Sequence, residues 1–264
     1  MTLEMRFTAL VLAGDRARDD PLAGTFPGRK ALLDINGRPM ISYVLDAVEG
    51  AQAVSDVYVV ANQVKDIEQG LIKCGRDVKR TRFLEGGVSP VNSVLKTVET
   101  LKPAFPVLVL TADNPLLTPK AIDDFCHQAR AEEGADVAFA LAEMSRLRAE
   151  FPGGRRTFVK LKGEGYSGCN LYALLNLKAL NAARFWLKVE ADRKKTFAMV
   201  AGFGFGTLIR VITRTITLEE ALVRASKVLG AVVRPVLVEE VRIAIDVDRV
   251  KQAELVRNIL KKEA

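Results

Sequence analysis

Four ionisable side chains in this chain stand where charge could act on a phosphate group. Lys30 ends a loop rich in small and charged residues, and Asp113 follows the apolar run Pro106–Leu110, directly before an Asn-Pro pair. Asp246 and Asp248 come after a further apolar segment. Carboxylates can hold a divalent cation that also binds phosphate oxygens, and an ammonium group can neutralise phosphate charge. These residue types favour metal-assisted phosphate chemistry.

Each of these side chains also has an ordinary structural explanation. Lys30 could be an exposed loop lysine, and Asp113 could be a turn residue before Asn-Pro. One carboxylate of the pair Asp246 and Asp248 could cap a helix that begins near Arg249. In an extended chain, however, residues two apart point to the same side, so the pair could supply metal ligands together. Spacing alone leaves both explanations open.

The loop after the first apolar run is the most informative segment. LVLAG leads into DRARDDPLAGTFPGRKALL, which is rich in small and charged residues. Backbone amides in such a loop can cradle phosphate, although a small-residue turn after a strand is also common chain geometry. Lys30 at the end of this loop would return an ammonium group to the carboxyl edge of a sheet.

The elements that must position these residues alternate between strand and helix. Apolar runs predict strands at 7–12, 56–61, 82–84, 106–110 and 135–141, and helical spacing predicts helices at 39–48, 65–74, 91–101 and 120–132. Ser89 and Pro90 supply a cap and a first residue for the third helix. This order predicts an α/β fold with a doubly wound, mostly parallel sheet, helices on both faces and ligands beyond the carboxyl ends of the strands.

The regular alternation of strands and helices ends after Met144. We expect strands at 156–162 and 241–245, and helices at 176–190, 218–229 and 249–262, and GYSGCN at 165–170 precedes another short apolar run. No repeat or linker divides the chain, so residues 1–264 are expected to form a single domain. Its second half, residues 143–264, is expected to act as a C-terminal lid or substrate module.

Composition narrows the class of protein. The chain has 264 residues, of which 49% are hydrophobic and 27% charged, which is typical of globular proteins and excludes collagen, coiled coils and low-complexity chains. Three widely spaced cysteines argue against a disulfide framework or a zinc site and favour the cytoplasm. The first residues lack a signal-peptide pattern. The longest apolar stretch, Phe197–Ile209, is too short for a transmembrane segment but leaves a greasy substrate or a homodimer contact open.

Positive charge is concentrated in one stretch of the sequence. From Glu143 to Lys195 there are 12 lysines and arginines against 5 acidic residues, which accounts for the whole net charge of +7. Such a stretch favours an anionic partner, with a solvated basic face as the equal alternative. Because no nucleic-acid motif accompanies it, we expect small phosphates as partners and no nucleic acid.

In this order, LAG with Lys30, TADNPLLTP and IDVD resemble the signatures of MobA-like nucleoside triphosphate transferases. The resemblance covers residues 1–120 and recurs at 240–264, and the region between matches at GYSGCNLY. It implies a nucleotide-diphospho-sugar transferase-like fold, with residues 1–142 as the nucleotide-binding half and 143–264 as the acceptor-binding and closing half. It is more specific for the fold than for the substrate.

The resemblance also implies a set of site residues. The nucleotide would contact Leu12, Ala13, Gly14, Asp15, Arg16, Arg18, Lys30, Asn62, Gly87 and Ser93. Lys30 and Asp113 would act in catalysis, and Asp113, Asp248 and Asp246 would hold Mg²⁺. GYSGCNLY would present Asn170 to the acceptor, and we expect Arg155, Arg156 and Lys160 of the basic stretch to receive the acceptor's phosphate.

Three positions depart from the family pattern. Asp15 stands where a second glycine is usual, and neither Arg16 nor Arg18 has the spacing of the usual downstream arginine. Ser89 and Pro90 stand where cytidylyltransferases of this kind often carry a basic residue. The sequence therefore gives no support for a cytidine preference.

We expect a Mg²⁺-dependent reaction in which a phosphate oxygen of a small acceptor attacks the α-phosphorus of a nucleoside triphosphate and releases pyrophosphate. The alternatives are a sugar-1-phosphate nucleotidyltransferase and a nucleotide-binding regulatory module without turnover. A glycosyltransferase ranks last, because an Asp-x-Asp motif occurs only at Asp246–Asp248. His127 is the only histidine, which argues against a Ser-His-Asp triad. The base, the acceptor and the oligomeric state stay open.

Overall fold

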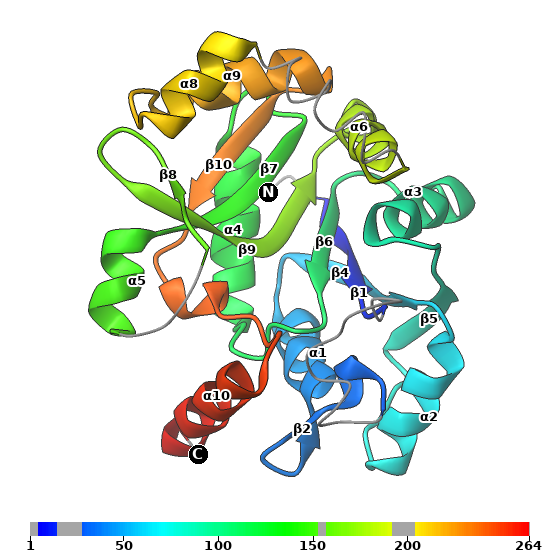
Figure 1. Cartoon of the computed structure of the whole chain (residues 1–264). Coiled ribbons are helices and arrows are strands. Elements are labelled where there is room, and N and C mark those ends of the chain that lie inside the picture. Colours follow the sequence, from blue (N-terminus) through cyan, green and yellow to red (C-terminus); the bar gives the residue numbers. More distant parts are fainter. Residues whose placement is uncertain (1–4, 15–27, 153–156, 192–203, 264) are drawn as a thin grey trace.

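The computed structural model describes residues 5–14, 28–152, 157–191 and 204–263. Its centre is a sheet of strand order β10-β7-β9-β6-β1-β4-β5, with β8 paired to β9 (Figure 1). The strands are β1 (Phe7–Leu12), β4 (Val54–Ala61), β5 (Thr81–Glu85), β6 (Val107–Thr111), β7 (Val137–Glu143), β8 (Val159–Lys160), β9 (Gly165–Leu174) and β10 (Val233–Leu237). A separate hairpin joins β2 (Asp34–Ile35) to β3 (Arg38–Pro39).

One half of the sheet is parallel throughout. β1 pairs with β4 and with β6, and β4 pairs with β5. Both faces of these strands are covered, which is why they appear in the sequence as continuous apolar runs rather than alternating ones. In β1, for example, Phe7, Ala9, Leu10 and Val11 are all fully buried. The predicted strand and helix alternation in this half is confirmed.

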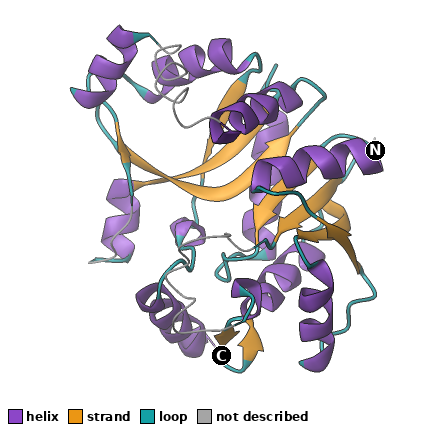
Figure 2. Cartoon of the chain, turned by 45° about the vertical axis from the view of Figure 1, so that its right-hand side comes forward, coloured by secondary structure: helices purple, strands orange, loops and turns teal. Residues whose placement is uncertain are grey.

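Helices cover both faces of the sheet (Figure 2). α1 (Met40–Gly50), α2 (Val64–Lys73) and α4 (Pro119–Ala131) pack on one face, and α3 (Pro90–Leu101), α6 (Ala179–Ala191) and α9 (Leu218–Leu229) pack on the other. The remaining helices are α5 (Met144–Glu150), α8 (Phe205–Ile212), α10 (Val250–Glu263) and the 3-10 turns η1 (Lys30–Leu32) and η2 (Val241–Ala244). The predicted doubly wound α/β fold is confirmed.

The start of α3 is built as the sequence predicts. Ser89 is the N-cap, its side chain accepts a hydrogen bond from the backbone N–H of Asn92, and Pro90 is the first helical residue. This cap satisfies a backbone donor that the first turn of a helix leaves unpaired. The entry of α3 at the carboxyl edge is therefore set by local sequence.

The other half of the sheet is mixed. β9 lies between β6 and β7 and is antiparallel to both, and it includes GYSGCN together with the short apolar run that follows. The strand predicted at 156–162 is reduced to β8, and β10, α5 and α8 were not predicted. In β10, Arg234 and Pro235 interrupt the apolar run, which hides the strand signal.

The strand predicted at 241–245 is wrong, because Val241–Ala244 form the 3-10 turn η2. Its apolar side chains are buried, as the prediction required. The strands that this segment meets, β7 and β9, are however each already paired on both sides. The segment packs against β7 and β9 without joining the sheet.

The predicted C-terminal lid is not confirmed. β10 extends the same sheet, and Leu222 and Ala225 of α9 pack on the core that α3 and α6 share. The division of one domain into halves at residue 142 stays a prediction. In the part of the chain that the structure describes, no helix combines the length and apolar character needed to cross a membrane.

Candidate functional site

Lys30 lies between two carboxylates from distant parts of the sequence. Its Nζ is 2.6 Å from Asp113 Oδ2 and 2.7 Å from Asp248 Oδ1. The side chains of Lys30, Asp113 and Asp248 are 16%, 19% and 34% exposed, so the cluster is partly buried but open to a ligand. The proposed chemistry needs these three residues at one edge of the sheet, and the structure brings them together.

The turn η1 presents Lys30 to this edge and is anchored on α2. Arg29 forms a salt bridge with Asp66 of α2 at 2.8 Å. Leu32 packs so closely on Gly70 that a Cβ atom at position 70 would lie 2.4 Å from Leu32 Cδ1. A glycine at this position lets η1 approach the helix, and the two contacts fix the turn that carries Lys30.

Asp113 follows β6 at its carboxyl end. Thr111 Oγ1 donates a hydrogen bond to Asp113 Oδ1 at 2.6 Å, which leaves the other oxygen facing Lys30. The backbone N–H of Val247 donates to the carbonyl of Asp113 at 2.8 Å, which joins this loop to the segment that carries Asp248. This backbone hydrogen bond holds Asp113 near Asp248, in addition to the ion pairs that both residues form with Lys30.

The cluster keeps Lys30 charged. Burial alone would lower the pKa of Lys30, but the charge and hydrogen bond of Asp113, followed by those of Asp248, outweigh it and raise the pKa above 10.5. Favourable interaction with opposite charges is the general cause of such a shift. At neutral pH Lys30 therefore carries its positive charge between the two carboxyl groups.

The donor set of this cluster fits a magnesium ion. One ammonium contacts both carboxylates, so their oxygens lie no further apart than about twice a hydrogen-bond length. Mg²⁺ binds one or two carboxylates and completes its shell with water and substrate phosphates. No group of three or more acidic, His or Cys side chains suited to a metal occurs among the described residues, so phosphate oxygens would have to complete the shell.

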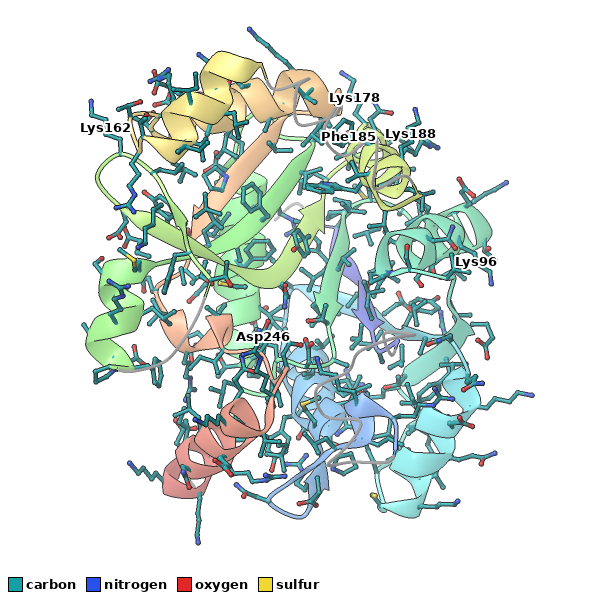
Figure 3. The ribbon with its side chains drawn as sticks, viewed as in Figure 1. Lys96, Lys162, Lys178, Phe185, Lys188 and Asp246 are labelled. Carbon is teal, nitrogen blue, oxygen red and sulfur yellow. The ribbon has the colours of Figure 1, made fainter. Side chains whose placement is uncertain are left out.

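Asp246 and Asp248 do not act as a pair on one side of an extended strand. The expected strand is the turn η2, and residues 245–248 follow it without regular structure. Asp248 contacts Lys30, whereas Asp246 Oδ2 accepts from Asn170 Nδ2 at 3.3 Å. Asp246 lies near the middle of the molecule, where α10 meets the strand ends (Figure 3). The structure thus links Asp246 to β9.

Asn114 joins three segments of the site, and the sequence pattern assigned it no role. Its side chain is 3% exposed, and Nδ2 donates to the carbonyl of Cys169 in β9 at 3.3 Å and to that of Ile243 in η2. These bonds tie the Asp113 loop to the segments that carry Asn170 and Asp248. Its burial next to Asp113 was the missing information, and the sequence pattern gives no signal of it.

The loops after β1, β4 and β5 converge as expected. A Cβ atom on Gly14 would lie 3.3 Å from Asn62 Oδ1, so these two residues are neighbours. Gly87 approaches α3 so closely that a Cβ atom there would lie 1.8 Å from Asn92 Oδ1. The hydroxyl of Ser93 accepts from the N–H of Gly87 at 2.9 Å. Ser93 is therefore engaged in holding the glycine loop, and its direct contact with nucleotide stays a prediction.

The structure describes only some of the predicted site residues. Asp15, Arg16, Arg18, Arg155 and Arg156 lie outside the described residues. Lys160 is exposed on β8. In Figure 3, Lys162 lies at the end of the β8–β9 hairpin, away from Asp246, and Lys178 and Lys188 lie at α6. The positive charge of the basic stretch is thus spread over separate places, and its described part does not form one patch.

Comparison with known proteins gives both partial and full-length matches. Probable molybdenum cofactor guanylyltransferases of Thermococcus gammatolerans, Thermococcus kodakarensis and Pyrococcus horikoshii are 34%, 32% and 31% identical to the chain. The matches cover 43–45% of this chain and 51%, 49% and 54% of those proteins. The chain thus matches about half the length of these curated relatives.

Solved structures match over nearly the whole fold. A hypothetical transferase from Thermus thermophilus is 26% identical, with a TM-score of 0.77 over 94% of this chain and 100% of its own. A CMP:2-keto-3-deoxy-manno-octonic acid synthetase complexed with CTP has a TM-score of 0.63 at 15% identity, over 98% of this chain and 100% of its own. The latter likeness supports the fold alone.

A family model places the chain among proteins of known type. The model is described as a MobA-like NTP transferase domain, and it matches residues 9–192. This range holds β1, the Lys30 turn, the Asp113 loop and Asn170, while Asp246 and Asp248 lie beyond it. Because the match covers more than half of the chain, the chain belongs to the MobA-like NTP transferase domain family.

Proposed function

We propose that this protein is a Mg²⁺-dependent nucleotidyltransferase that moves a nucleoside monophosphate from a nucleoside triphosphate to a phosphorylated small-molecule acceptor. The observation that carries the proposal is the contact of one ammonium, Lys30, with two carboxylates, Asp113 and Asp248. The cluster follows β6 at the carboxyl edge, where ligands of open α/β sheets bind. Family membership and the likeness to the Thermus thermophilus transferase support the same reaction class.

In this proposal, Asp113 and Asp248 hold the metal ion, and Lys30 moves its hydrogen bonds from the carboxylates to phosphate oxygens. Bound Mg²⁺ supplies positive charge that neutralises the triphosphate and the charge that develops on its oxygens during transfer. The two carboxylates raise the pKa of Lys30 in the free protein, and phosphate oxygens would place the same kind of negative charge beside the ammonium, so we expect Lys30 to stay charged. The protein thus contributes positioning and electrostatic stabilisation.

The reaction needs no covalent enzyme intermediate. A phosphate oxygen of the acceptor forms a bond to the α-phosphorus, and the bond from the α-phosphorus to the bridging oxygen of the β-phosphate breaks. The electron pair leaves with pyrophosphate, so the products are pyrophosphate and a nucleoside diphosphate ester of the acceptor. The glycine loop after β5 would support the base, and Asn170 would contact the acceptor.

We propose GTP as the nucleotide donor. The three curated relatives are named guanylyltransferases, and the sequence lacks the basic residue that cytidylyltransferases often carry near Ser89. Asn62 lies beside Gly14, and the N–H of Gly87 donates to the hydroxyl of Ser93. These loops offer backbone and amide groups for the edge of a base.

A thermal-shift panel tests nucleotide binding. The four ribonucleoside triphosphates are added singly with Mg²⁺, and GTP is expected to raise the melting temperature most, because a ligand that binds only the folded state stabilises it. Asp113→Asn should abolish the Mg²⁺-dependent part of this shift. Asp124→Asn on α4 is the matched control, because Asp124 forms a salt bridge with Lys120 on the surface of that helix. Equal shifts in both variants would contradict the proposed metal ligand.

Pyrophosphate release tests turnover. A mixed pool of phosphorylated acceptors with GTP and Mg²⁺ should yield pyrophosphate and a new nucleotide product, which mass spectrometry identifies. A sugar-1-phosphate nucleotidyltransferase would form product only from sugar 1-phosphates. A regulatory module would bind nucleotide and release no pyrophosphate with any acceptor.

The proposed role of Arg155 and Arg156 is tested separately. Replacing both with alanine should weaken acceptor binding and leave the nucleotide shift unchanged, because the pair is expected to contact only the acceptor's phosphate. Titration of the acceptor in the pyrophosphate assay measures this effect. An unchanged KM for the acceptor would remove these arginines from the site.

A further inference from the structure

A cavity of about 340 Å³ lies between the sheet and the helices α8 and α9. Its walls come from β7, β8, β9 and the two helices, which stand together at the upper left of Figure 1. This volume is in the range of pockets that bind small molecules. The proposed reaction cluster of Lys30, Asp113 and Asp248 is not part of its lining.

The cavity wall is almost entirely apolar. Its lining includes Phe139 and Leu141 of β7, Leu208 and Val211 of α8, Leu222 of α9, and Leu161 beyond β8. The lining hydroxyl of Thr207 already accepts a hydrogen bond from Arg224. The wall therefore offers area for apolar groups and few hydrogen-bonding partners for polar ones, whose burial without partners is costly.

β9 connects this cavity to the proposed reaction site. Gly168 lines the cavity, and Asn170, two residues further along β9, contacts Asp246 at 3.3 Å. Two residues of an extended strand span at most ~7 Å, which is about the length of a phosphate ester linkage and its neighbouring atoms. A phosphate near Asn170 thus leaves the rest of its molecule beside the cavity.

The strand is locally reshaped at this connection. Phe139 pairs with Tyr172 and Leu141 with Gly168, so β9 carries additional residues opposite a single residue of β7. Asn170 lies within this irregular stretch and has a left-handed backbone with φ of 52°. Bulges of this kind re-aim side chains and occur next to binding sites.

Resting on the nucleotidyl transfer proposed above, we propose that the acceptor is a phosphate monoester with an apolar organic part, which binds in the cavity between β7–β9 and helices α8 and α9. Its phosphate lies at the Asn170 end of the cavity and faces the reaction cluster. Hydrophobic burial of the organic part then supplies much of the binding energy. A polar organic part, such as a sugar, would leave its own hydrogen-bonding groups unpaired against this wall.

Pocket-filling variants test this proposal. A Cβ atom on Gly168 meets no other atom within 4 Å, so Gly168→Leu adds volume to the cavity without a clash of its first carbon. Ala221→Leu on α9 fills the cavity from the opposite wall and serves as a second variant. Gly206→Leu is the matched control, because Gly206 is exposed, has the same open surroundings and does not line the cavity.

Binding is measured first, without nucleotide. The fluorescence of 1-naphthyl phosphate reports an apolar environment, and n-hexyl phosphate is used as a competitor. Wild type and Gly206→Leu should bind both, whereas Gly168→Leu and Ala221→Leu should bind them on the order of tenfold more weakly, as expected for lost space in a hydrophobic pocket. Equal binding by all four proteins would overturn the proposal.

Turnover is measured second, with GTP, Mg²⁺ and matched acceptors. n-Hexyl phosphate should give pyrophosphate with a lower KM than glucose 1-phosphate or glycerol 3-phosphate, and only the pocket-filling variants should raise that KM. Preference for a polar ester, unaffected by Gly168→Leu, would overturn the proposed acceptor while leaving nucleotidyl transfer intact. Absence of any nucleotide-induced thermal shift would instead contradict the proposed function, and the fluorescence result would still decide what the cavity binds.

A second copy of the chain is the competing occupant of the cavity. Sedimentation velocity over a range of concentrations, with and without n-hexyl phosphate, distinguishes it. A monomer whose mass does not change with the ester supports a small-molecule site. A dimer that dissociates on addition of the ester, or in Gly168→Leu, would assign the cavity to self-association and overturn the proposal.

Discussion

The two halves of the sheet differ in how they are built. Strands β6, β1, β4 and β5 are all parallel, and the pairings of β1 with β6 and of β4 with β5 run without interruption. Around β9 the pairing is antiparallel and its register with β7 shifts between Phe139 and Leu141. The parallel half supports the loops expected to bind nucleotide, and the mixed half contributes Asn170 and most of the walls of the apolar cavity.

This difference indicates a division of labour. The parallel half places charged groups at strand ends with little room for variation, because neighbouring strands fix one another. The mixed half contains a bulge, a hairpin and the helices α8 and α9, and it is tied to the Asp113 loop through Asn114. We infer that the first half serves the reaction shared by the family and the second sets the acceptor.

The largest loss of activity is expected from removing the positive charge of Lys30, which lies at the carboxyl edge of the parallel half. Lys30→Met should lower kcat on the order of 10³-fold, because a preorganised positive charge at a phosphate contributes several kcal/mol to catalysis. Pyrophosphate release measures this loss. Lys120→Met is the matched control, since Lys120 pairs with Asp124 on the surface of α4. A similar loss in both variants would show that the position of Lys30 is not special.

A smaller but still large effect is expected where the two halves are joined. Asn114→Asp places a carboxylate against the carbonyls of Cys169 and Ile243, so it should cost about 2 kcal/mol of stability and reduce activity through misplacement of Asp113. Urea denaturation measures the first and kcat the second. Asn114→Ala separates loss of the hydrogen bonds from added charge. If Asn114→Asp retained full activity and stability, the halves would be joined by other contacts.

A moderate loss of stability is expected from a substitution in the parallel half of the sheet. Glu85 at the end of β5 accepts hydrogen bonds from the N–H groups of Gln63 and Val64 at the start of α2. Glu85→Ala should cost about 1 kcal/mol, as for loss of a helix cap, and should weaken nucleotide binding only slightly. Glu85→Gln should retain part of the stability, because its amide oxygen can still accept. A large fall in kcat would show that this loop does more than support the frame.

The smallest effect is expected at the helices of the mixed half. The hydrogen bond from Arg210 is the main cause that lowers the pKa of Glu220 from 4.5 to about 2, and it links α8 to α9. Because the folded-state pKa is depressed, this contribution is present above pH 4.5 and is lost as the pH falls through about 2. Wild type should lose slightly more stability across that window than Glu220→Gln.

Thermal melts by circular dichroism over this pH window measure the difference between the two proteins. All other carboxylates titrate in both, so they cancel in the comparison. Parallel loss of stability in wild type and Glu220→Gln would show that the salt bridge to Arg210 does not contribute to holding α8 on α9.

The parallel half could be predicted because its strands and helices have strong local signals. β1 lies where the apolar run FTALVL places it, and α3 begins at Pro90 with Ser89 as its cap. The mixed half was predicted less well. Residues 241–245 have the apolar character of a strand, yet residues 241–244 pack as η2 against β7 and β9, which are already paired on both sides.

The candidate site divides in the same way. Lys30, Asp113 and Asp248 could be selected from residue type and their place after apolar segments. Asn114 could not, because its function in the structure depends on carbonyl groups of β9 and η2 that are 55 and 129 residues away. The separate contacts of Asp246 and Asp248 could not be predicted either, because they follow from the backbone path after η2.

Three features could be predicted from the sequence alone: the alternation of strand and helix in the first half, the residue types at the strand ends and the family. These follow from side-chain periodicity, capping and local spacing, which act over a few residues. Three other features are seen only in the folded chain: the antiparallel insertion of β9, the hydrogen bonding of Asn114 and the cavity between β9, α8 and α9. Those features depend on which distant backbone edges and apolar faces meet, and no local pattern encodes such a meeting.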